Sequence, residues 1–567
     1  MTTTLEARNV TFTHKGNSVP ALSDFSISVN PGEFVLVMGP SGAGKSTFCQ
    51  TLNGLVPHLV KGRLRGSVHV GDQETTAFTV AQLAERVGLV FQDFEAQLFS
   101  TNVRLEVAFA AENLAIEREE IHRRVDESLC QVSLKGFDKR QPATLSGGQK
   151  QRLAIASVLV AHPDVICLDE PTTDLDPVGK QEVFQIANAL REQDVTLIVV
   201  EHETQEALTA TRLVLMDEGR IVRDGPAREV LREVEVFDQI KIMPLQIPEF
   251  FAALGTKAVD RPLEVAEAAS QFSSGQLRIK DEAYQRILAT EAERAARYGE
   301  AVLEVDKLSH RYATGLQALD DVSFGIKRGE FVAVLGQNGS GKTTLVKHLN
   351  GLLRSTAGSL FVEGKDSSKM SVLELGGTVG YVFQNPDHQI FSDTIREEVA
   401  FGLKKRHLTE ADIDERVKEA LHAVGLDGRE EDDPFSLTKG QRQRVAVASV
   451  LAVRPDVLIL DEPTTGLDYR EQRSMMALVK QLNEAGSTIV IVTHAMWVVC
   501  EYAHRALVMK DGRLVEDGTV REVFRDEAAL TEMSLQAPPI VSLGNQLGHP
   551  VISVAEMLEI TEGGTQR

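Results

Sequence analysis

Cysteine is scarce in this sequence of 567 residues, which contains only Cys49, Cys130, Cys167 and Cys500, scattered along the chain. Their spacing matches no metal-binding motif, so we expect free thiols in a reducing compartment. No apolar run approaches the roughly 18 residues that span a bilayer. The first ten residues lack the basic stretch and apolar core of a signal peptide. We therefore expect any work at a membrane to depend on another chain.

Positive charge is also in short supply. The 60 lysine and arginine residues face 82 acidic residues, which gives a formal net charge of -22. The resulting negative field disfavours phosphate backbones and acidic lipid headgroups, so we do not expect a dedicated nucleic-acid binder. Hydrophobic residues make up 43% and charged residues 25% of the chain, as is typical of globular proteins. The length predicts two or more domains.

An internal repeat organises the chain. The segment GPSGAGKST recurs as GQNGSGKTT, VICLDEPTTDLD recurs as VLILDEPTTGLD, and VVEHE recurs as IVTHA. Lys45 and Lys342, in the first of these segments, are 297 positions apart, whereas later pairs are offset by 292, so one gap of five residues aligns the two copies. The pairs with the offset of 292 are Gln92 and Gln384, Ser146 and Thr438, Glu170 and Glu462, and His202 and His494.

The repeat also predicts the domain boundaries. The first copy ends in LQIPEFFAALG and the second in the similar LQAPPIVSLGNQLG. We therefore predict a first domain over residues 1–255 and a second over residues 301–567, each with a small C-terminal appendage. Residues 256–300 lie between them and include DEAYQRILATEAERAARYG, which has helical composition. We expect this segment to be a partly helical connector rather than a flexible linker.

The hydrophobic pattern predicts an α/β fold. GEFVLVMG and GEFVAVLG are short apolar runs that end in Gly-rich turns, and helix-like segments follow them. DVICLDE and TLIVVEH are further apolar runs of strand length, separated by polar stretches of helical composition. Alternating strands and helices of this kind predict a mainly parallel sheet at the core of each domain.

Each copy contains the pattern strand, GxxxxGK[ST], helix, which is that of a P-loop. Its glycines let backbone N–H groups close around phosphates at a helix N-terminus. We expect Lys45 and Lys342 to reach the β- and γ-phosphates, and Ser46 and Thr343 to hold Mg²⁺. The predicted nucleotide-binding residues of the two P-loops are Gly39, Pro40, Ser41, Gly42, Ala43, Gly44, Lys45, Ser46 and Thr47, and Gly336, Gln337, Asn338, Gly339, Ser340, Gly341, Lys342, Thr343 and Thr344.

An Asp-Glu pair ends a second apolar strand in each copy. Asp169 and Asp461 are placed to bind the Mg²⁺ shell, and the adjacent Glu170 and Glu462 to accept a proton from the attacking water. A single pair of this kind more often begins a solvated loop. Here the pair accompanies a P-loop twice, which favours the catalytic interpretation.

The segment LSGGQ, just before the first Asp-Glu strand, resembles the signature motif of the ATP-binding-cassette superfamily, which other P-loop ATPases lack. The resemblance covers nearly the whole chain. It implies two cassettes that pair head to tail, each with a helical signature subdomain. Each ATP then lies between the P-loop of one cassette and the signature of the other, at a helix N-terminus. The first signature comprises Ser146, Gly147, Gly148 and Gln149.

The resemblance also assigns roles outside the P-loops. Gln92 and Gln384 match the family's Q-loop glutamine, which contacts Mg²⁺ or the water and senses the membrane partner. The remaining matches are His202 and His494, at the histidine that contacts the γ-phosphate, and Asp176 and Asp468, at the end of the D-loop. A lone glutamine or histidine is usually structural, but the shared offset favours function.

The second signature departs from the family pattern. It reads LTKGQ and comprises Thr438, Lys439, Gly440 and Gln441. In the head-to-tail arrangement this altered loop completes the site that contains Lys45 and Glu170. We expect both sites to bind ATP and to differ in their rates of hydrolysis.

The aromatic residue that stacks on adenine in the family is matched in one copy only. Tyr312 occupies this position in the second copy, whereas the first has His14. Either His14 stacks less well, or Phe12 takes over the role, or both residues serve in packing.

FQNPDHQIFS, followed by REEVAFG, resembles the Q-loop region of energy-coupling-factor importers and their cobalt and nickel relatives. The first copy has the looser version FQDFEAQLFS. The resemblance implies a peripheral ATPase at the cytoplasmic face of the cell membrane. Its partners would be a transmembrane coupling subunit and a small membrane subunit that captures a vitamin, a vitamin precursor or a transition metal ion.

Other classes of protein compete with this interpretation. Fused ATPases of sugar importers are also tandem, but their second P-loop site is commonly degenerate, whereas both are intact here. Soluble tandem translation factors usually carry a long charged connector and lack FQNPDHQ. A scaffold without activity would not need Glu170 and Glu462.

Overall fold

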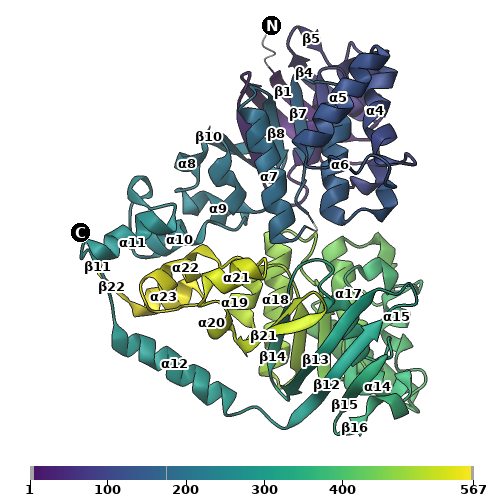
Figure 1. The fold of residues 1–567 in the computed structure, drawn as a ribbon, viewed down its shortest axis with the longest axis vertical. Helices are drawn as coiled ribbons and strands as arrows, with labels where there is room; N and C mark the ends of the chain where they lie inside the picture. The colour runs from purple at the N-terminus through teal and green to yellow at the C-terminus, as the bar shows by residue number, and fades with distance from the viewer. Residues whose placement is uncertain (1–4, 174, 564–567) are drawn as a thin grey trace. The chain divides into compact units, whose positions relative to one another are not determined.

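The computed structural model describes residues 5–173 and 175–563 (Figure 1). The chain separates into two compact units, Met1–Ala252 with Lys257–Leu263, and Ala253–Thr256 with Glu264–Arg567. Each unit contains one copy of the sequence repeat, and each has a six-stranded and a four-stranded sheet. The predicted α/β fold with a mainly parallel core is confirmed.

The six-stranded sheet of the first unit has the strand order β10 (Arg220–Pro226), β9 (Arg212–Asp217), β3 (Phe34–Met38), β8 (Thr196–Val200), β7 (Val165–Asp169) and β6 (Val87–Val90). All neighbours pair in parallel except β10, which is antiparallel to β9. Every residue of β3, β7 and β8 is buried, as expected for parallel strands that are covered on both faces.

Side chains of β3 alternate between two hydrophobic clusters. Phe34 and Leu36 join a cluster that includes residues of the surrounding helices, while Val35 and Val37 join one that includes the four-stranded sheet. That antiparallel sheet has the order β2 (Leu22–Val29), β1 (Leu5–His14), β4 (Gly62–Val70) and β5 (Gln73–Glu74). β3 therefore runs through the middle of the core and ends at the P-loop.

The helices of the first unit begin with α1 (Lys45–Leu52), directly after the P-loop. Three of them, α4, α5 and α6, pack against one another and form the helical subdomain that the resemblance implied (Figure 1). The helices are α2 (Leu55–His58), α3 (Val80–Leu83), α4 (Val103–Asn113), α5 (Arg118–Gln131), α6 (Gly147–Leu159), α7 (Pro177–Arg191), α8 (Ala227–Val230), α9 (Val234–Ile240) and α10 (Gln246–Ala253), with a short 3-10 helix η3 (Thr204–Thr209).

The second unit repeats this plan. Its six-stranded sheet has the order β17 (Val379–Val382), β18 (Val457–Asp461), β19 (Thr488–Val492), β14 (Phe331–Leu335), β20 (Arg505–Lys510) and β21 (Arg513–Thr519). Its four-stranded sheet has the order β13 (Gln317–Lys327), β12 (Ala301–Arg311), β15 (Ala357–Val362) and β16 (Lys365–Asp366). The helices are α13 (Lys342–Leu349), α14 (Val372–Thr378), α15 (Ile395–Phe401), α16 (Glu410–Ala423), α17 (Lys439–Leu451), α18 (Tyr469–Glu484), α19 (Met496–Tyr502), α20 (Val520–Val523), α21 (Glu527–Glu532), α22 (Pro539–Gln546) and α23 (Val554–Ile560).

Much of the predicted connector packs on the tail of the second unit. It contains α11 (Val265–Ser273), β11 (Leu277–Ile279) and α12 (Asp281–Ala295), and β11 pairs antiparallel with β22 (Thr561–Gly563). Arg521, which is buried, donates to Glu291 on α12 and to Glu556 on α23, each at 2.9 Å. This part of the connector is thus attached to the tail by a strand pair and buried ion pairs. The boundaries at residues 255 and 301 remain predictions.

Across residues 5–173 and 175–563, helices that combine the length and the apolar character of a membrane span are not found.

Candidate active site

Both P-loops connect a central strand to a helix. In the first unit the loop joins β3 to α1, and the side chain of Lys45 turns back across it, donating to the carbonyl oxygens of Gly39 (2.8 Å) and Pro40 (3.0 Å). A Cβ atom at Gly39 would lie 2.3 Å from the carbonyl oxygen of Met216, so only glycine fits there. The lysine is thereby held over a loop of backbone N–H groups at a helix N-terminus, which is an arrangement suited to phosphate.

The second P-loop has the same geometry. The ammonium group of Lys342 donates to the carbonyl oxygens of Gly336 (2.7 Å) and Gln337 (2.8 Å). Both helices begin at the lysine, after a glycine in the left-handed region, Gly44 with φ 95° and Gly341 with φ 103°. The two sequence copies thus produce two equivalent phosphate-binding loops.

A hydroxyl and a carboxyl group meet at the end of β7. Ser46 Oγ, on α1, donates to Asp169 Oδ1 at 3.1 Å. Burial raises the pKa of Asp169 to about 6, against the opposing effect of the bond from Ser46. Hydroxyl and carboxylate oxygens are ligands that Mg²⁺ prefers, so this pair fits the metal that the sequence predicted.

Two predicted residues, His202 and Gln92, converge on Glu170. His202 Nε2 lies 2.6 Å from Glu170 Oε1, and Gln92 Nε2 donates to Glu170 Oε2 at 2.7 Å. Burial raises the pKa of Glu170, but the hydrogen bond and the charge of His202 outweigh it and hold the pKa below its ordinary value. Glu170 is therefore ionised at neutral pH, as a general base must be.

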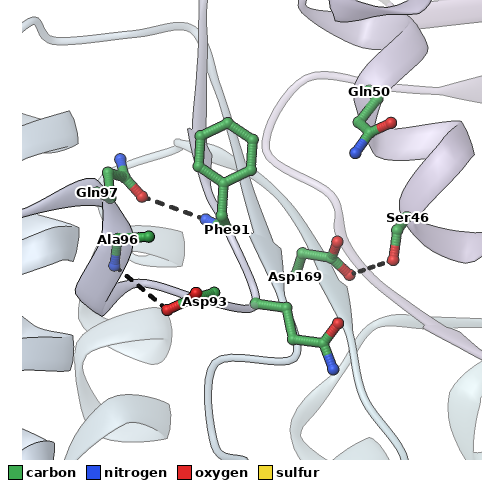
Figure 2. Close-up of a pocket in the computed structure, with 8 residues that line it drawn as sticks. Ser46, Gln50, Phe91, Asp93, Ala96, Gln97 and Asp169 are labelled. Carbon is green, nitrogen blue, oxygen red and sulfur yellow. Dashed lines mark hydrogen bonds between the residues drawn. The ribbon is translucent and has the colours of Figure 1, made fainter. Parts of the chain in front are cut away.

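A pocket of about 460 Å³ opens beside these residues (Figure 2). Figure 2 shows Ser46 and Asp169 pointing toward each other, with Gln50 on the same helix as Ser46. The loop on the other side is shaped by Gln97, whose Oε1 accepts from the Phe91 amide at 3.3 Å. The lining residues are Ser46, Gln50, Phe91, Gln92, Asp93, Ala96, Gln97 and Asp169.

The second site differs in detail. His494 Nε2 lies 2.9 Å from Glu462 Oε1, but the two are not aligned as a hydrogen bond. Gln384 is exposed, and no bond joins it to Glu462 within the described parts of the chain. Tyr381, on β17, donates instead to Asp461 Oδ2 at 2.6 Å. Burial raises the pKa of Asp461, although the bond from Tyr381 opposes this effect.

The signature residues cap helices. Ser146 caps α6 and accepts from the Gln149 amide at 3.3 Å, while Gln149 Oε1 accepts from the Ser146 amide at 3.1 Å. Thr438 and Gln441 form the same capping box on α17, at 3.3 and 3.2 Å. The threonine of the altered signature therefore preserves the local structure. Asp176 and Asp468 cap α7 and α18, where their side chains accept from the amides of Gly179 and Glu471, both at 2.9 Å.

The two candidate adenine positions have different surroundings. Tyr312 is 36% exposed, and its hydroxyl lies 3.1 Å from Thr344 Oγ1. His14 packs edge-on against Phe12 at 4.9 Å between ring centroids, and Phe12 is fully buried. Phe12 thus belongs to the core, whereas the ring of Tyr312 is exposed and that of His14 is partly exposed.

Two residues that contact this machinery were not predicted from the sequence. Tyr381 bonds Asp461, and Glu201, next to His202, bonds the loop after Glu170. The repeat could have pointed to them, because Tyr381 is aligned with Leu89 and Glu201 is aligned with Thr493. A polar residue that is aligned with a residue of a different type in the other copy marks a difference between the two sites.

The geometry defines a tandem P-loop ATPase, and comparison with known proteins identifies the family. The family model described as "ABC transporter" matches residues 22–173 and 319–465. A protein of Caldanaerobacter subterraneus is 53% identical over 544 residues, covering 96% of each chain. A protein of Methanosarcina acetivorans is 39% identical over 564 residues, covering 98% of this chain and 92% of that one. Both are provisionally named as ABC transporter ATP-binding proteins.

Among solved structures, cbiO1 from Clostridium perfringens, described as part of the ABC transporter complex cbiONQ, is 36% identical and covers 44% of this chain and 99% of that one, with a TM-score of 0.39. The chain belongs to the ABC transporter family. It binds and hydrolyses ATP as the ATPase component of a transporter.

Proposed function

We propose that this chain powers an importer of the energy-coupling-factor type, with a transmembrane coupling subunit and a small membrane subunit that captures the substrate. The main support for this proposal is an exposed phenylalanine beside the Q-loop, which is present in both units. Phe391 is 60% exposed and packs edge-on against Phe401, with 4.7 Å between ring centroids. Phe99 is 63% exposed and packs in the same way against Phe109 at 4.6 Å.

A buried carboxyl group holds each phenylalanine loop in place. Glu398 Oε2 accepts from the amides of Phe391 and Ser392, both at 3.0 Å. The first unit repeats this arrangement, since Glu106 Oε2 accepts from the amides of Phe99 (3.0 Å) and Ser100 (2.6 Å). Fixed and exposed aromatic rings are typical of contact surfaces for other chains. This supports one docking surface for the coupling subunit in each unit.

We assign the catalytic roles from the contacts at each site. Glu170 and Glu462 accept the proton of the attacking water, and the bond from His202 keeps Glu170 ionised until it does so. Lys45 and Lys342 bind the β- and γ-phosphates from their positions over the P-loops. Gln92, which already contacts Glu170, orients the water in the first site.

The site residues fit Mg²⁺. Ser46 with Asp169, and Thr343 with Asp461, supply the oxygen ligands, and the Q-loop glutamines Gln92 and Gln384 add to that set. One oxygen of Asp461 is buried and has no hydrogen-bond partner among the described residues, as expected of a ligand atom. When bound, Mg²⁺ neutralises charge on the phosphates of the nucleotide.

We further propose that each ATP binds between the P-loop of one copy and the signature of the other. The γ-phosphate then holds the copies closed, and its hydrolysis lets them part. Segments beside Gln92 and Gln384 transmit this motion to the coupling subunit, because each glutamine lies seven residues before the exposed phenylalanine of its docking surface and Gln92 contacts Glu170. Tyr312 stacks on the adenine of its site, and the chain works at the cytoplasmic face of the membrane through its partners.

The test is purification of the tagged chain from detergent-solubilised native membranes, followed by identification of the proteins that accompany it. We expect two integral membrane proteins in a stable complex. Deletion of the gene should abolish uptake of one vitamin, vitamin precursor or metal ion, and wild-type protein, but not the Glu170→Gln/Glu462→Gln variant, should restore it.

The opposite results are equally decisive. A chain that fractionates away from membranes, accompanies no integral membrane protein and leaves vitamin and metal uptake unchanged on deletion would favour a soluble tandem ATPase. Loss of sugar uptake alone would favour the fused sugar-importer class.

A further inference from the structure

A buried carboxyl group lies beneath the first catalytic site. Glu201 follows β8 directly and is 2% exposed. Its Oε1 accepts hydrogen bonds from the hydroxyl (2.8 Å) and the amide (3.2 Å) of Thr172, and its Oε2 accepts from the amide of His202 at 3.3 Å. Its own amide donates to Val37 on β3 at 3.2 Å. Glu201 is thus anchored to the central sheet and contacts two loops.

Both of these loops meet at Glu170. Thr172 lies two residues after Glu170, in the loop that leads to Asp176 at the start of α7. His202, next to Glu201, contacts Glu170 at 2.6 Å. The position of Glu170 relative to His202 therefore depends on how the two loops are held together, and Glu201 joins them.

The second unit has a different arrangement. Thr493 occupies the position of Glu201, and its hydroxyl accepts from the amide of Ala495, within its own loop, at 3.0 Å. No hydrogen bond from Thr493 to Thr464, the counterpart of Thr172, occurs in the described residues of this unit. The loop is held from α18 instead, where Gln472 Nε2 donates to the carbonyl oxygen of Leu467 at 2.9 Å.

The charges around these positions also differ. Lys180 on α7, the counterpart of Gln472, pairs with Glu203, and Glu206 lies nearby on η3. Burial raises the pKa of Glu201 to about 8, with Glu206 and Glu203 adding to the rise while Thr172 and Lys180 oppose it. The neutral form of the side chain therefore predominates at pH 7. Glutamine keeps one oxygen that can accept from Thr172, whereas the aligned threonine of the second unit makes no such bond in the described residues.

We propose that Glu201 is a positioning residue for ATP hydrolysis at the first P-loop, where it fastens the loop that starts at Glu170 to the loop that carries His202. The proposal rests on the roles assigned above to Glu170 and His202. It makes the first catalytic glutamate dependent on a connection that the second lacks.

Hydrogen exchange of the full-length chain tests the connection without reference to activity. Glu201→Thr, which introduces the residue of the second unit, should speed amide exchange in residues 170–176 about tenfold, because the Thr172 amide loses its acceptor. Residues 462–468 serve as the internal control and should not change. Glu201→Gln should stay within about twofold of wild type, and so should Thr493→Val.

ATP hydrolysis in a Glu462→Gln background tests the catalytic consequence. Glu201→Thr should lower kcat about tenfold with KM for ATP within about twofold, and Glu201→Gln should restore the rate. If Glu201→Thr unfolds the first unit in a thermal melt, Thr172→Val, which removes only the hydroxyl donor, replaces it. If the ATPase rate of the Glu462→Gln background is too low to measure, the hydrogen-exchange measurement tests the proposal.

Unchanged exchange in residues 170–176, or equal losses in Glu201→Thr and Glu201→Gln, would overturn the proposal. Failure of the proposed catalytic roles gives a different result. In that case Glu170→Gln, added to the Glu462→Gln background, would leave ATP hydrolysis unchanged, while the exchange effect of Glu201→Thr would persist.

Discussion

The hydroxyl group of Tyr381 donates a hydrogen bond of 2.6 Å to Asp461, whereas the aligned strand position of the first unit holds Leu89. The two candidate metal-binding carboxylates are therefore held differently, Asp461 by a phenol from β17 and Asp169 by Ser46 from the P-loop helix. In Asp461 the second oxygen has no hydrogen-bond partner among the described residues. The sites thus differ in their buried residues as well as in their signatures.

Tyr381→Phe should destabilise the second unit and weaken its Mg²⁺ site. The change leaves Asp461 with a buried oxygen that has lost its donor, which costs about 1–3 kcal/mol. Urea unfolding should show this loss, and hydrolysis in a Glu170→Gln background should need more Mg²⁺ for half its maximal rate. Tyr284→Phe on α12, outside the active site, is the control and should change neither quantity.

Replacing both P-loop lysines should abolish hydrolysis. Lys45→Ala with Lys342→Ala removes the two cations that we assign to the phosphates, and we expect a fall of at least about 100-fold in kcat, as for other groups that stabilise transition-state charge. A phosphate-release assay measures it. Lys369→Ala, an exposed lysine of the second unit, should retain the wild-type rate. Wild-type turnover in the double variant would contradict the assignment of the P-loops.

The two catalytic glutamates should contribute unequally. Glu462→Gln removes the base of the site that the intact LSGGQ completes in the proposed pairing, so it should leave less than about half of the ATPase rate, while Glu170→Gln should leave more than about half. Removing a general base typically costs 10²–10⁴-fold at its own site, so the remaining rate reports the other site. Steady-state hydrolysis at saturating ATP, with nucleotide binding as the control, measures both. Equal losses would show that the LTKGQ signature is without consequence.

Phe391→Ala and Phe99→Ala should weaken assembly with the membrane partners. Each change removes an exposed ring whose backbone is fixed by a buried glutamate, so nucleotide binding should stay within about twofold of wild type. Copurification of the membrane subunits measures assembly. Leu373→Ala on α14, also about half exposed, is the matched control. Full assembly in both phenylalanine variants would remove the support for the docking surfaces.

The stability of the first unit should depend on Glu206. Burial, with help from Glu203, raises the pKa of Glu206 from its ordinary value of 4.5 to about 7. The unfolded chain therefore releases a proton from Glu206 at a lower pH than the folded chain, and the stabilisation present below pH 4.5 is lost as the pH rises toward 7.

Glu206→Gln removes this dependence, so the variant should match wild type near pH 4.5. It should be more stable by roughly 1–2 kcal/mol at pH 8. Thermal melts across this range measure the difference. Glu112→Gln, an exposed carboxylate on α4, should show no such trend, and a constant difference for Glu206→Gln would contradict the argument.

Most of the catalytic constellation could be predicted because its parts are contiguous. A P-loop occupies nine consecutive residues at the junction of a strand and a helix, so the sequence already contains its geometry. Glu170 and Glu462 follow buried strands, and parallel strands end at the same edge of a sheet, which brings them to the P-loops. The family resemblance assigned His202 only to the γ-phosphate, and its contact with Glu170 at 2.6 Å comes from the structure.

The unpredicted contacts join segments that are distant in the chain. Tyr381 and Asp461 are 80 residues apart, and Thr172 and Glu201 are 29 residues apart. Neither pair forms a motif, and each depends on which strands lie next to each other and on the register of their residues. Burial also reverses what residue type suggests, since Glu201 is acidic by type and neutral in its site at pH 7.

The sequence by itself determined the fold class, the two P-loops, the positions of Glu170 and Glu462 after buried strands, and the altered second signature, because these follow from local pattern and from the register of an internal repeat. Only the tertiary structure decided that Phe12 belongs to the core, that Tyr381 holds Asp461, and that Glu201 joins the loops of Glu170 and His202. The physical reason is that burial and the partners of a polar side chain are set by neighbours in space, which a linear pattern does not specify.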